Sequence, residues 1–452
     1  MEKLYTLNPK ALWAQLRKEH FSFWMVCGYM ILQYFDPMEI YHSLAVLHLD
    51  KVVFFLAVLA LPMDPRRRWV RDATNVWMIL FWLVLVASSA LAIYPALSWK
   101  HWFDFFGWMA IYFLIINTVT SPERYFIFLV LFLLANFKLS FFGARTWIKR
   151  GFGFRNWGIL GPPGDFQNSA DLSIEMLMFA PIAFELAMFV KPRVKRITHW
   201  FLMLGAVTGA MTVLGASSRG AQVALAFQGA WVALQRKLNV KVLIGIALVG
   251  WIGYALLPAG EKARFSRSGT DPTSLQRFDY WRAGLKMIEH HPVLGVGFWN
   301  FPAVYAAEYP NKLWHGTAQL PHNIFMQVGT DAGLLGLGIF VILIWRNFSL
   351  AREIRRRCAQ NKNAPPFAPN IARGLVVAAW GFIIAGQFDT VTYYSFLWIN
   401  LALMVSLANI VRRSEEKTVA VSAAQRALAD GGGLAAPPGT APSSVPVARS
   451  PQ

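Results

Sequence analysis

Cysteine and charged residues are scarce in this sequence, and each shortage argues against a class of protein. Only two of the 452 residues are cysteine, Cys27 in an apolar run and Cys358 in a basic one. Two thiols so far apart do not make a disulfide framework or a cysteine-ligated zinc site. Charged residues make up 15% of the chain, whereas a soluble domain has about 25%. The composition therefore rules out a soluble enzyme.

Apolar and aromatic residues take the place of the missing charges. Hydrophobic residues make up 56% of the chain, with 19 Trp and 35 Phe, and the mean hydropathy is +0.40. Several apolar runs approach the roughly 20 residues with which a helix crosses a bilayer, so we predict an all-α polytopic membrane protein with about twelve transmembrane helices. The expected spans are 21–36, 44–62, 74–93, 102–119, 124–142, 169–190, 198–216, 220–235, 240–257, 323–345, 371–388 and 393–411.

Acidic residues are fewer than basic ones, and the basic excess follows a pattern. The chain has 43 Lys and Arg against 24 Asp and Glu, a formal net charge of +19. The basic residues collect in alternate connections, as they do in cytoplasmic loops of membrane proteins.

The last part of the chain is rich in Ala, Pro, Gly and Ser, which is typical of disorder. The expected organisation is a cytoplasmic N-terminus (1–20), transmembrane helices 1–9 (21–257) with an outer basic loop (143–168), a large periplasmic loop (258–322), transmembrane helices 10–12 (323–411) and a disordered cytoplasmic tail (412–452).

One arginine stands where two expected helices meet on the outer side. Ser218 and Arg219 lie between the runs 198–216 and 220–235. A charged side chain at this depth is costly unless it faces protein or water, and a guanidinium offers fixed donors that suit a phosphate or diphosphate. The alternative is a tight turn between two helices, with Arg219 reaching for the membrane surface.

The expected outer loop 143–168 is basic, which runs against the usual distribution of charge. It carries Arg145, Lys149, Arg150 and Arg155 with a single acid. An anionic ligand would explain this exception, and so would contact with anionic lipid or lipopolysaccharide headgroups. We take the three arginines as candidate substrate-binding residues.

The large outer loop contains an amphipathic stretch. Its apolar positions recur at helical spacing and are Phe278, Trp281, Leu285 and Ile288. Pro292 ends the pattern, so we expect a helix that lies on the membrane surface or over a cavity. Arg277 and Trp281 share one face of this helix, and Arg282 follows them; all three are candidate site residues.

Two histidines stand where this loop returns to the membrane. His315 and His322 are separated by six residues, and Asn323 follows directly. A neutral imidazole at such a wet boundary can take a proton from a hydroxyl, and Asn323 would orient it or hydrogen-bond a sugar. Alternatively, His322 is only the first residue of a helix and is satisfied by backbone groups.

Three segments together resemble the O-antigen ligase and polymerase superfamily of bacterial lipid-linked glycan transferases. They are SSRGAQVAL, RFDYWRAGLKMIEHHPVLGVGFWNF and PHNIFMQVGTDAGLLGLG, within roughly residues 205–345. The resemblance implies a glycosyltransferase type C-like membrane fold and transfer of a glycan from undecaprenyl diphosphate, without nucleotide sugar, cofactor or metal. It implies that Arg219 and Arg277 hold the donor diphosphate and that His322 acts on the acceptor hydroxyl as general base.

Members of this superfamily differ in their acceptor, which is lipid A-core for a ligase, another repeat unit for a polymerase, or a protein Ser or Thr for an O-oligosaccharyltransferase. The outer basic loop favours lipid A-core, because that acceptor is anionic. We therefore predict an inverting, metal-independent ligase of the bacterial inner membrane, with its active site facing the periplasm. The expected partners are the lipid-linked donor, the acceptor and membrane lipids, with no nucleic acid. The substrate-binding residues would be Ser218, Arg145, Arg150, Arg155, Trp281, Arg282, His315 and Asn323.

A lipid-linked glycan transporter is the alternative from another class. Transporters place ionisable residues near the middle of the bilayer, in broken helices at paired positions. Here the polar candidates collect at the outer boundary instead, so the pattern favours a transferase.

Overall fold

The computed structural model describes residues 2–153, 158–164, 166–216, 218–236, 262, 269–313 and 316–430. All of the secondary-structure elements in these ranges are helices, as predicted. The α-helices are α1 (Glu2–Tyr5), α2 (Pro9–Leu16), α3 (Phe21–Phe35), α4 (Pro37–Ile40), α5 (His42–Ala45), α6 (Leu49–Ala60), α7 (Ala73–Ala90), α8 (Pro95–Lys100), α9 (Trp102–Thr118), α10 (Pro122–Lys149), α11 (Ser169–Val190), α12 (Arg196–Gly215), α13 (Arg219–Gln235), α16 (Pro272–His290), α17 (Phe301–Glu308), α18 (Ile324–Gln360), α19 (Ala368–Ala385) and α20 (Ser395–Asp430). The short 3₁₀ helices are η1 (Leu61–Met63), η2 (Lys191–Arg193), η3 (Pro310–Lys312) and η4 (Gly386–Phe388).

The protein is a polytopic membrane protein. Within the described ranges, eight segments are long and apolar enough to cross a bilayer. They are Ser43–Met63, Ala73–Ala90, Pro122–Lys149, Ser169–Arg193, Arg196–Gly215, Ile324–Gln360, Ala368–Phe388 and Ser395–Ala420. Helices α3 and α9 are apolar but shorter. The expected span at 240–257 lies outside the described residues, so a total of about twelve stays a prediction.

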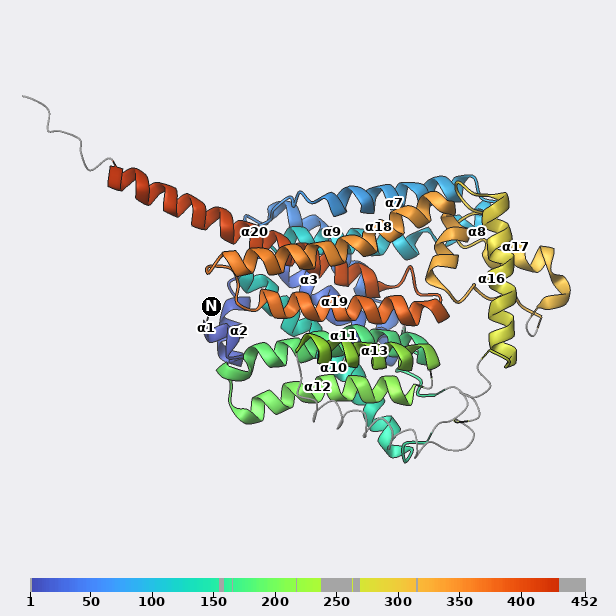
Figure 1. Ribbon diagram of the computed structural model, residues 1–452, viewed down its shortest axis with the longest axis horizontal. Helices are drawn as coiled ribbons and strands as arrows, with labels where there is room; N and C mark the ends of the chain where they lie inside the picture. Colours follow the sequence, from blue (N-terminus) through green and yellow to red (C-terminus); the bar gives the residue numbers. More distant parts are fainter. Residues whose placement is uncertain are drawn as a thin grey trace, which may run out of the picture.

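The long helices run side by side as a bundle, and α16 lies across one of its ends (Figure 1). Helix α11 packs against α12 and α19, while α10 packs against α12 and α3. Helix α11 is apolar around almost its whole circumference, which is the pattern of a helix that other helices surround. These contacts fix where the ends of α13, α18 and α19 meet beneath α16.

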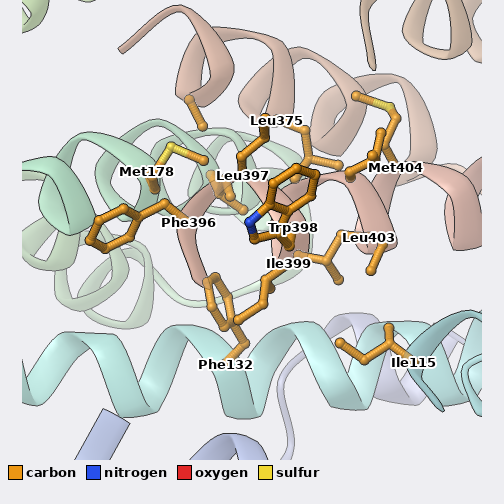
Figure 2. Close-up of a cluster of buried hydrophobic side chains, with 14 of the residues drawn as sticks. Ile115, Phe132, Met178, Leu375, Phe396, Leu397, Trp398, Ile399, Leu403 and Met404 are labelled. Carbon is orange, nitrogen blue, oxygen red and sulfur yellow. The ribbon is translucent and has the colours of Figure 1, made fainter. Parts of the chain in front are cut away.

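The core of the bundle is built around Trp398 of α20, which is fully buried. Figure 2 shows its indole among apolar side chains of several helices, including Leu375 and Met404. The indole Nε1 donates a hydrogen bond to the carbonyl of Thr392, 2.9 Å away, so the ring's polar group is satisfied inside the core. The ring of Phe105 packs edge-on against it, with 4.8 Å between the centroids.

Helix α18 is broken near its N-terminal end, and the turn that follows α16 fills the break. Gly333 has φ 64° and ψ −167°, which is not helical. The amide of Val296 donates to the carbonyl of Thr330 at 2.8 Å, and the amide of Leu334 donates to the carbonyl of Pro292 at 2.7 Å. The turn thus satisfies backbone groups that the helix leaves open, and it anchors α16 to the bundle.

Three helices extend further than the sequence predicted. Helix α10 continues to Lys149, so Arg145 and Lys149 lie on a helix and not in an outer loop. Helix α18 continues to Gln360, and α20 continues to Asp430, where we expected disordered chain from residue 412. The physical reason is that ion pairs join the polar ends of α18 and α20, as between Arg357 and Glu415. Residues 431–452 lie outside the described ranges.

Candidate functional site

Four segments meet at the end of the bundle that α16 covers. They are the start of α13, helix α16 itself, residues 319–323 ahead of α18, and the connection 386–394 between α19 and α20. Hydrogen bonds join them: Arg219 to Asp271, Trp281 to Pro321, and His322 to Thr390. The sequence-predicted residues Arg219, Arg277 and His322 all lie on these segments.

The Ser-Arg-Gly sequence opens α13, and each of its three residues has a distinct role. Ser218 caps the helix, with its hydroxyl accepting from the amide of Ala221 at 3.4 Å. Arg219 is the first helical residue. A Cβ at Gly220 would lie 2.7 Å from Cδ2 of Phe388, so only glycine lets the α19–α20 connection approach this closely. The turn therefore presents Arg219 beside Asp271 and Phe388.

Arg219 is held by an acid at the start of α16. Its Nη2 donates to Oδ2 of Asp271 at 3.1 Å and to Oδ1 at 3.2 Å. Burial raises the pKa of Asp271, but the hydroxyls of Ser274 and Thr273 and the charge of Arg219 outweigh burial and hold the pKa below its usual value. Asp271 is therefore ionised near neutral pH, and an anionic ligand would compete with it for Arg219.

Arg277 is a half-buried cation on the face of α16 that is turned to the site. Burial lowers its pKa, and so does the nearby charge of Arg219, while the charges of Asp389 and Asp271 raise it. In the described part of the chain, no carboxylate lies within ion-pair distance of its guanidinium. Two arginines and two acids are thus within electrostatic reach of one another, and Arg277 keeps donors for a ligand.

His322 is fixed by its backbone and faces an acid. Its φ of 51° is left-handed, which is strained for a non-glycine residue, and its amide donates to the hydroxyl of Thr390 at 2.8 Å. The ring Nδ1 is buried without a hydrogen-bond partner and lies 3.9 Å from Oδ1 of Asp389. The ring Nε2 lies 3.1 Å from the amide oxygen of Gln319, at an exposed position.

This arrangement gives the two imidazole nitrogens different surroundings. Nδ1 faces the Asp389 carboxylate, and Nε2 is open to a ligand that displaces Gln319. A carboxylate on one side of an imidazole stabilises the imidazolium that forms when the other nitrogen takes a proton. His322 and Asp389 can therefore do base chemistry at Nε2.

Three of the predicted substrate-binding residues form hydrogen bonds with backbone groups beside the site. Trp281 donates from Nε1 to the carbonyl of Pro321 at 2.9 Å, which ties α16 to the residue before His322. Asn323 caps α18, accepting from the amides of Phe325 at 2.9 Å and Met326 at 3.1 Å. Ser218 caps α13. A second role in binding substrate stays a prediction for each.

The other predicted binding residues make no described bond to Arg219, Arg277 or His322. Arg145 is exposed on α10, and Arg282 points into solvent with 80% of its side chain accessible, 3.9 Å from Asp279. Arg150 donates to the carbonyl of Gly158 at 2.8 Å and so holds its own loop. Arg155 and His315 lie outside the described residues.

Sequence reasoning did not find the acids of the site. Asp389 follows the apolar run 371–388 and Asp271 precedes an amphipathic helix, and neither stands in a recognisable motif. The usable signal for Asp389 was a charged residue in a very short connection between two membrane spans. Over the described residues, no three His, Cys, Asp or Glu side chains gather closely enough to hold a metal ion.

Comparison with known proteins points to one family. The O-antigen ligase family model matches residues 182–341, the segment that carries Arg219, Arg277 and His322. The O-antigen ligase of Salmonella typhimurium is 25% identical over 234 residues, which cover 49% of this chain and 55% of that protein. A Rickettsia felis protein, described as a candidate polysaccharide ligase, is 26% identical over 124 residues, 25% of this chain and 30% of that protein.

The chain thus spans about half the length of the Salmonella protein and less of the Rickettsia one. The family match nevertheless covers three of the four segments that meet beneath α16, all but residues 386–394, and the described helices agree with a membrane protein. On these findings residues 182–341 of this chain resemble the O-antigen ligase family.

Proposed function

We propose that this protein is an O-antigen ligase-type glycosyltransferase, which moves a glycan from undecaprenyl diphosphate to lipid A-core at the periplasmic face of the bacterial inner membrane. The observation that carries the proposal is the meeting of Arg219, Arg277 and His322 at one end of a membrane bundle. The match of residues 182–341 to the O-antigen ligase family model supports the class of reaction. Both substrates are lipids, so a site at the end of the bundle meets them at the membrane surface.

Arg219 and Arg277 hold the donor diphosphate in this proposal. Negative charge grows on the leaving oxygen as the glycosidic bond breaks, and guanidinium groups placed there stabilise it. Arg219 already binds a carboxylate, that of Asp271, at 3.1 Å, so its donors are oriented for an anion. Two arginines do this work without a metal ion, and metal independence follows as a prediction.

His322 is the base in this proposal. The acceptor hydroxyl takes the position of the Gln319 amide, and its proton passes to Nε2. The hydroxyl oxygen then bonds to the anomeric carbon while the bond from that carbon to the diphosphate oxygen breaks, and the electron pair leaves with the diphosphate. Attack opposite the leaving group inverts the anomeric centre. Asp389, 3.9 Å from Nδ1, stabilises the imidazolium.

The acceptor assignment rests on charge. Lipid A-core is anionic, and the exposed Arg145 together with Arg150 lies on the segment that leads to the start of α11. The carbonyl of Ala216, just before Ser218, accepts from Ser169 at the start of that helix. The basic segment is therefore adjacent to the turn that presents Arg219, where an anionic acceptor would approach.

A reconstituted reaction tests the assignment. The purified protein is mixed with undecaprenyl-diphosphate-linked oligosaccharide, lipid A-core and EDTA, and the products are resolved on a gel. We expect a single shift of the lipid A-core band, equal to one donor glycan. A ladder on the undecaprenyl carrier without lipid A-core would contradict the acceptor and indicate a polymerase. Movement of labelled donor across proteoliposomes without any covalent product would contradict the transferase itself.

A further inference from the structure

The end of the bundle opposite the candidate site contains a large cavity that the transfer reaction does not use. The site lies at the start of α18 and the end of α19, whereas the cavity reaches Asn363 in the connection between the other ends of these two helices. Its volume is about 730 Å³, which lies in the range of small-molecule sites. This is the end that carries α1 and the projecting part of α20 (Figure 1).

Among the described residues, those that line the cavity include cations and no carboxylate. Its cationic residues come from two separate parts of the chain, Arg66 and Arg68 after η1, and Arg413 and Lys417 on α20. Hydroxyl groups, among them that of Ser121, line the space between them. Four like charges around one cavity repel each other in the empty protein, and an anion between them relieves this repulsion.

Three of these cations form no ion pair with the residues that the structure describes, although the charge of Glu416 acts on Arg413 from a longer distance. Arg66 pairs with Glu19 at 3.0 Å, but Arg413 donates only to the carbonyl of Thr120, at 3.4 Å. Among the residues that the structure describes, no carboxylate lies within ion-pair distance of Arg68, Arg413 or Lys417. The positive charge of the cavity is therefore available to a ligand.

Two arginines just outside the cavity, Arg412 and Arg346, form ion pairs with acids of the protein. Arg412, the neighbour of Arg413, donates to Glu353 at 2.7 Å and to Asp72 at 2.7 Å. Arg346 also donates to Asp72, at 3.0 Å. The acids Asp72 and Glu353 are thus already bound to arginines outside the cavity.

The start of α10 adds to the positive potential. Ser121 caps this 28-residue helix, accepting from the amide of Arg124 at 3.3 Å, and both Ser121 and Pro122 line the cavity. The N-terminal end of a helix carries partial positive charge and favours a phosphate group. Side chains and helix therefore favour the same kind of ligand.

We propose that this cavity binds the phosphate group of an anionic ligand, seated between Arg68, Arg413 and Lys417. Two sources carry this chemistry: the headgroup of an anionic phospholipid in the adjoining leaflet, for which basic pockets between membrane helices are known sites, or a phosphate-bearing solute. The site is independent of the transfer reaction, because it lies at the other end of the molecule.

The full-length protein in lipid nanodiscs tests this site, with the thermal unfolding midpoint as the readout. One arm compares discs of neutral phosphatidylcholine with discs that also contain phosphatidylglycerol. The other arm titrates inorganic phosphate into the neutral discs at constant ionic strength. A ligand that binds the folded state raises the midpoint. We expect a rise in the arm that supplies the ligand, and about tenfold or more weaker apparent binding in Arg68→Gln/Arg413→Gln/Lys417→Gln.

The control variant is Arg352→Gln/Arg355→Gln/Arg356→Gln, which removes three exposed charges from α18 outside the cavity and should bind like the wild type. The single variant Lys417→Gln separates a loss of binding from a loss of folding. This side chain is exposed, so its replacement should weaken binding without changing the thermal midpoint of the unliganded protein. No rise in either arm overturns the proposal. An equal loss of binding in the control variant also overturns it, because the effect would then reflect total charge.

Discussion

Arg124 is a charged side chain that the fold buries completely. Its guanidinium donates to Glu19 at 2.6 Å, to Asp64 at 2.7 Å and to the carbonyl of Thr118 at 3.0 Å. The side chains of Arg124, Glu19 and Asp64 are all inaccessible to solvent. The ring of Phe23 lies 5.4 Å from its Cζ. This network joins the segments around α2, η1 and α10, so it fixes one end of the bundle.

Replacing Arg124 should cost more stability than replacing any exposed arginine. Arg124→Met leaves the buried Asp64 without its cation and Glu19 with Arg66 alone, and removing one partner of a buried pair costs roughly 3–5 kcal/mol. The measurement is reversible unfolding of the detergent-solubilised protein, with Arg17→Met, an exposed arginine on the same side, as control. Equal stability of the two variants would show that the network contributes nothing.

In the proposed mechanism Asp389 acts through His322, so its replacement should change the turnover rate more than the binding of the donor. Asp389→Asn should lower kcat by on the order of tenfold to a thousandfold while leaving KM for the donor nearly unchanged. Without the carboxylate beside Nδ1, proton transfer to Nε2 loses its electrostatic support, so the loss should appear in kcat. Asp389→Glu should restore part of the rate. An Asp389→Asn variant with an unaltered kcat would assign Asp389 a purely structural role.

The candidate site was only partly predictable from the sequence. Arg219 and His322 stood out as polar residues at the expected outer boundary of an apolar run, and Arg277 stood out on one helix face with Trp281 in the amphipathic stretch. The structure places all three on segments that meet. Asp389 and Asp271 did not stand out, because an acid in a short connection has no periodic pattern and its partners are distant in sequence. Arg282 shares the motif of Arg277 yet points into solvent, because positions five residues apart lie about 140° from each other around a helix axis.

At the scale of helices, hydropathy located the spans but not their ends. It detects the part of a helix that meets lipid, so it stopped α10 at residue 142, whereas the helix continues to Lys149. It also missed that α18 and α20 extend beyond the apolar run, because the ion pairs that join their ends, such as Arg412 with Glu353, are long-range in sequence. The break at Gly333 was missed for the same reason, since the turn that fills it belongs to another part of the chain.

The contact between α10 and α12 should depend on a small residue. A Cβ at Gly143 would lie 2.3 Å from Cγ2 of Thr212, and the hydroxyl of Thr212 donates to the carbonyl of Ser140 at 2.8 Å. Gly143→Val should therefore force the helices apart and destabilise the protein by about 1–3 kcal/mol. Gly229→Val in α13 is the matched control, because no atom lies within 4 Å of a Cβ there. Equal thermal midpoints for the two variants would contradict this packing.

The molecule as a whole has two unlike ends. One end carries α16 and the segments that bring Arg219, Arg277 and His322 together. The other carries the buried Arg124 network and the cavity lined by Arg68 and Arg413. If the basic connections lie in the cytoplasm, as the distribution of charge predicts, then α16 faces the periplasm, where lipid A-core and the donor glycan would meet.

Labelling of single cysteines tests this orientation. In a chain with Cys27→Ala and Cys358→Ser, Leu285→Cys on the exposed face of α16 should react with an impermeant maleimide in intact cells whose outer membrane is permeabilised. Lys10→Cys in α2, also exposed, should react only after the inner membrane is opened. The reverse pattern would place the candidate site in the cytoplasm and contradict the proposed acceptor.

The central claim is that the residues beneath α16 carry out glycan transfer. The most direct test is the transfer rate of purified His322→Ala, Arg219→Ala and Arg277→Ala with lipid-linked donor and lipid A-core. His290→Ala and Lys286→Ala, exposed positions on the same helix α16, serve as matched controls. The account predicts a loss on the order of a hundredfold or more in the three site variants and near-normal rates in the controls. Near-normal transfer by folded His322→Ala and Arg219→Ala would contradict it.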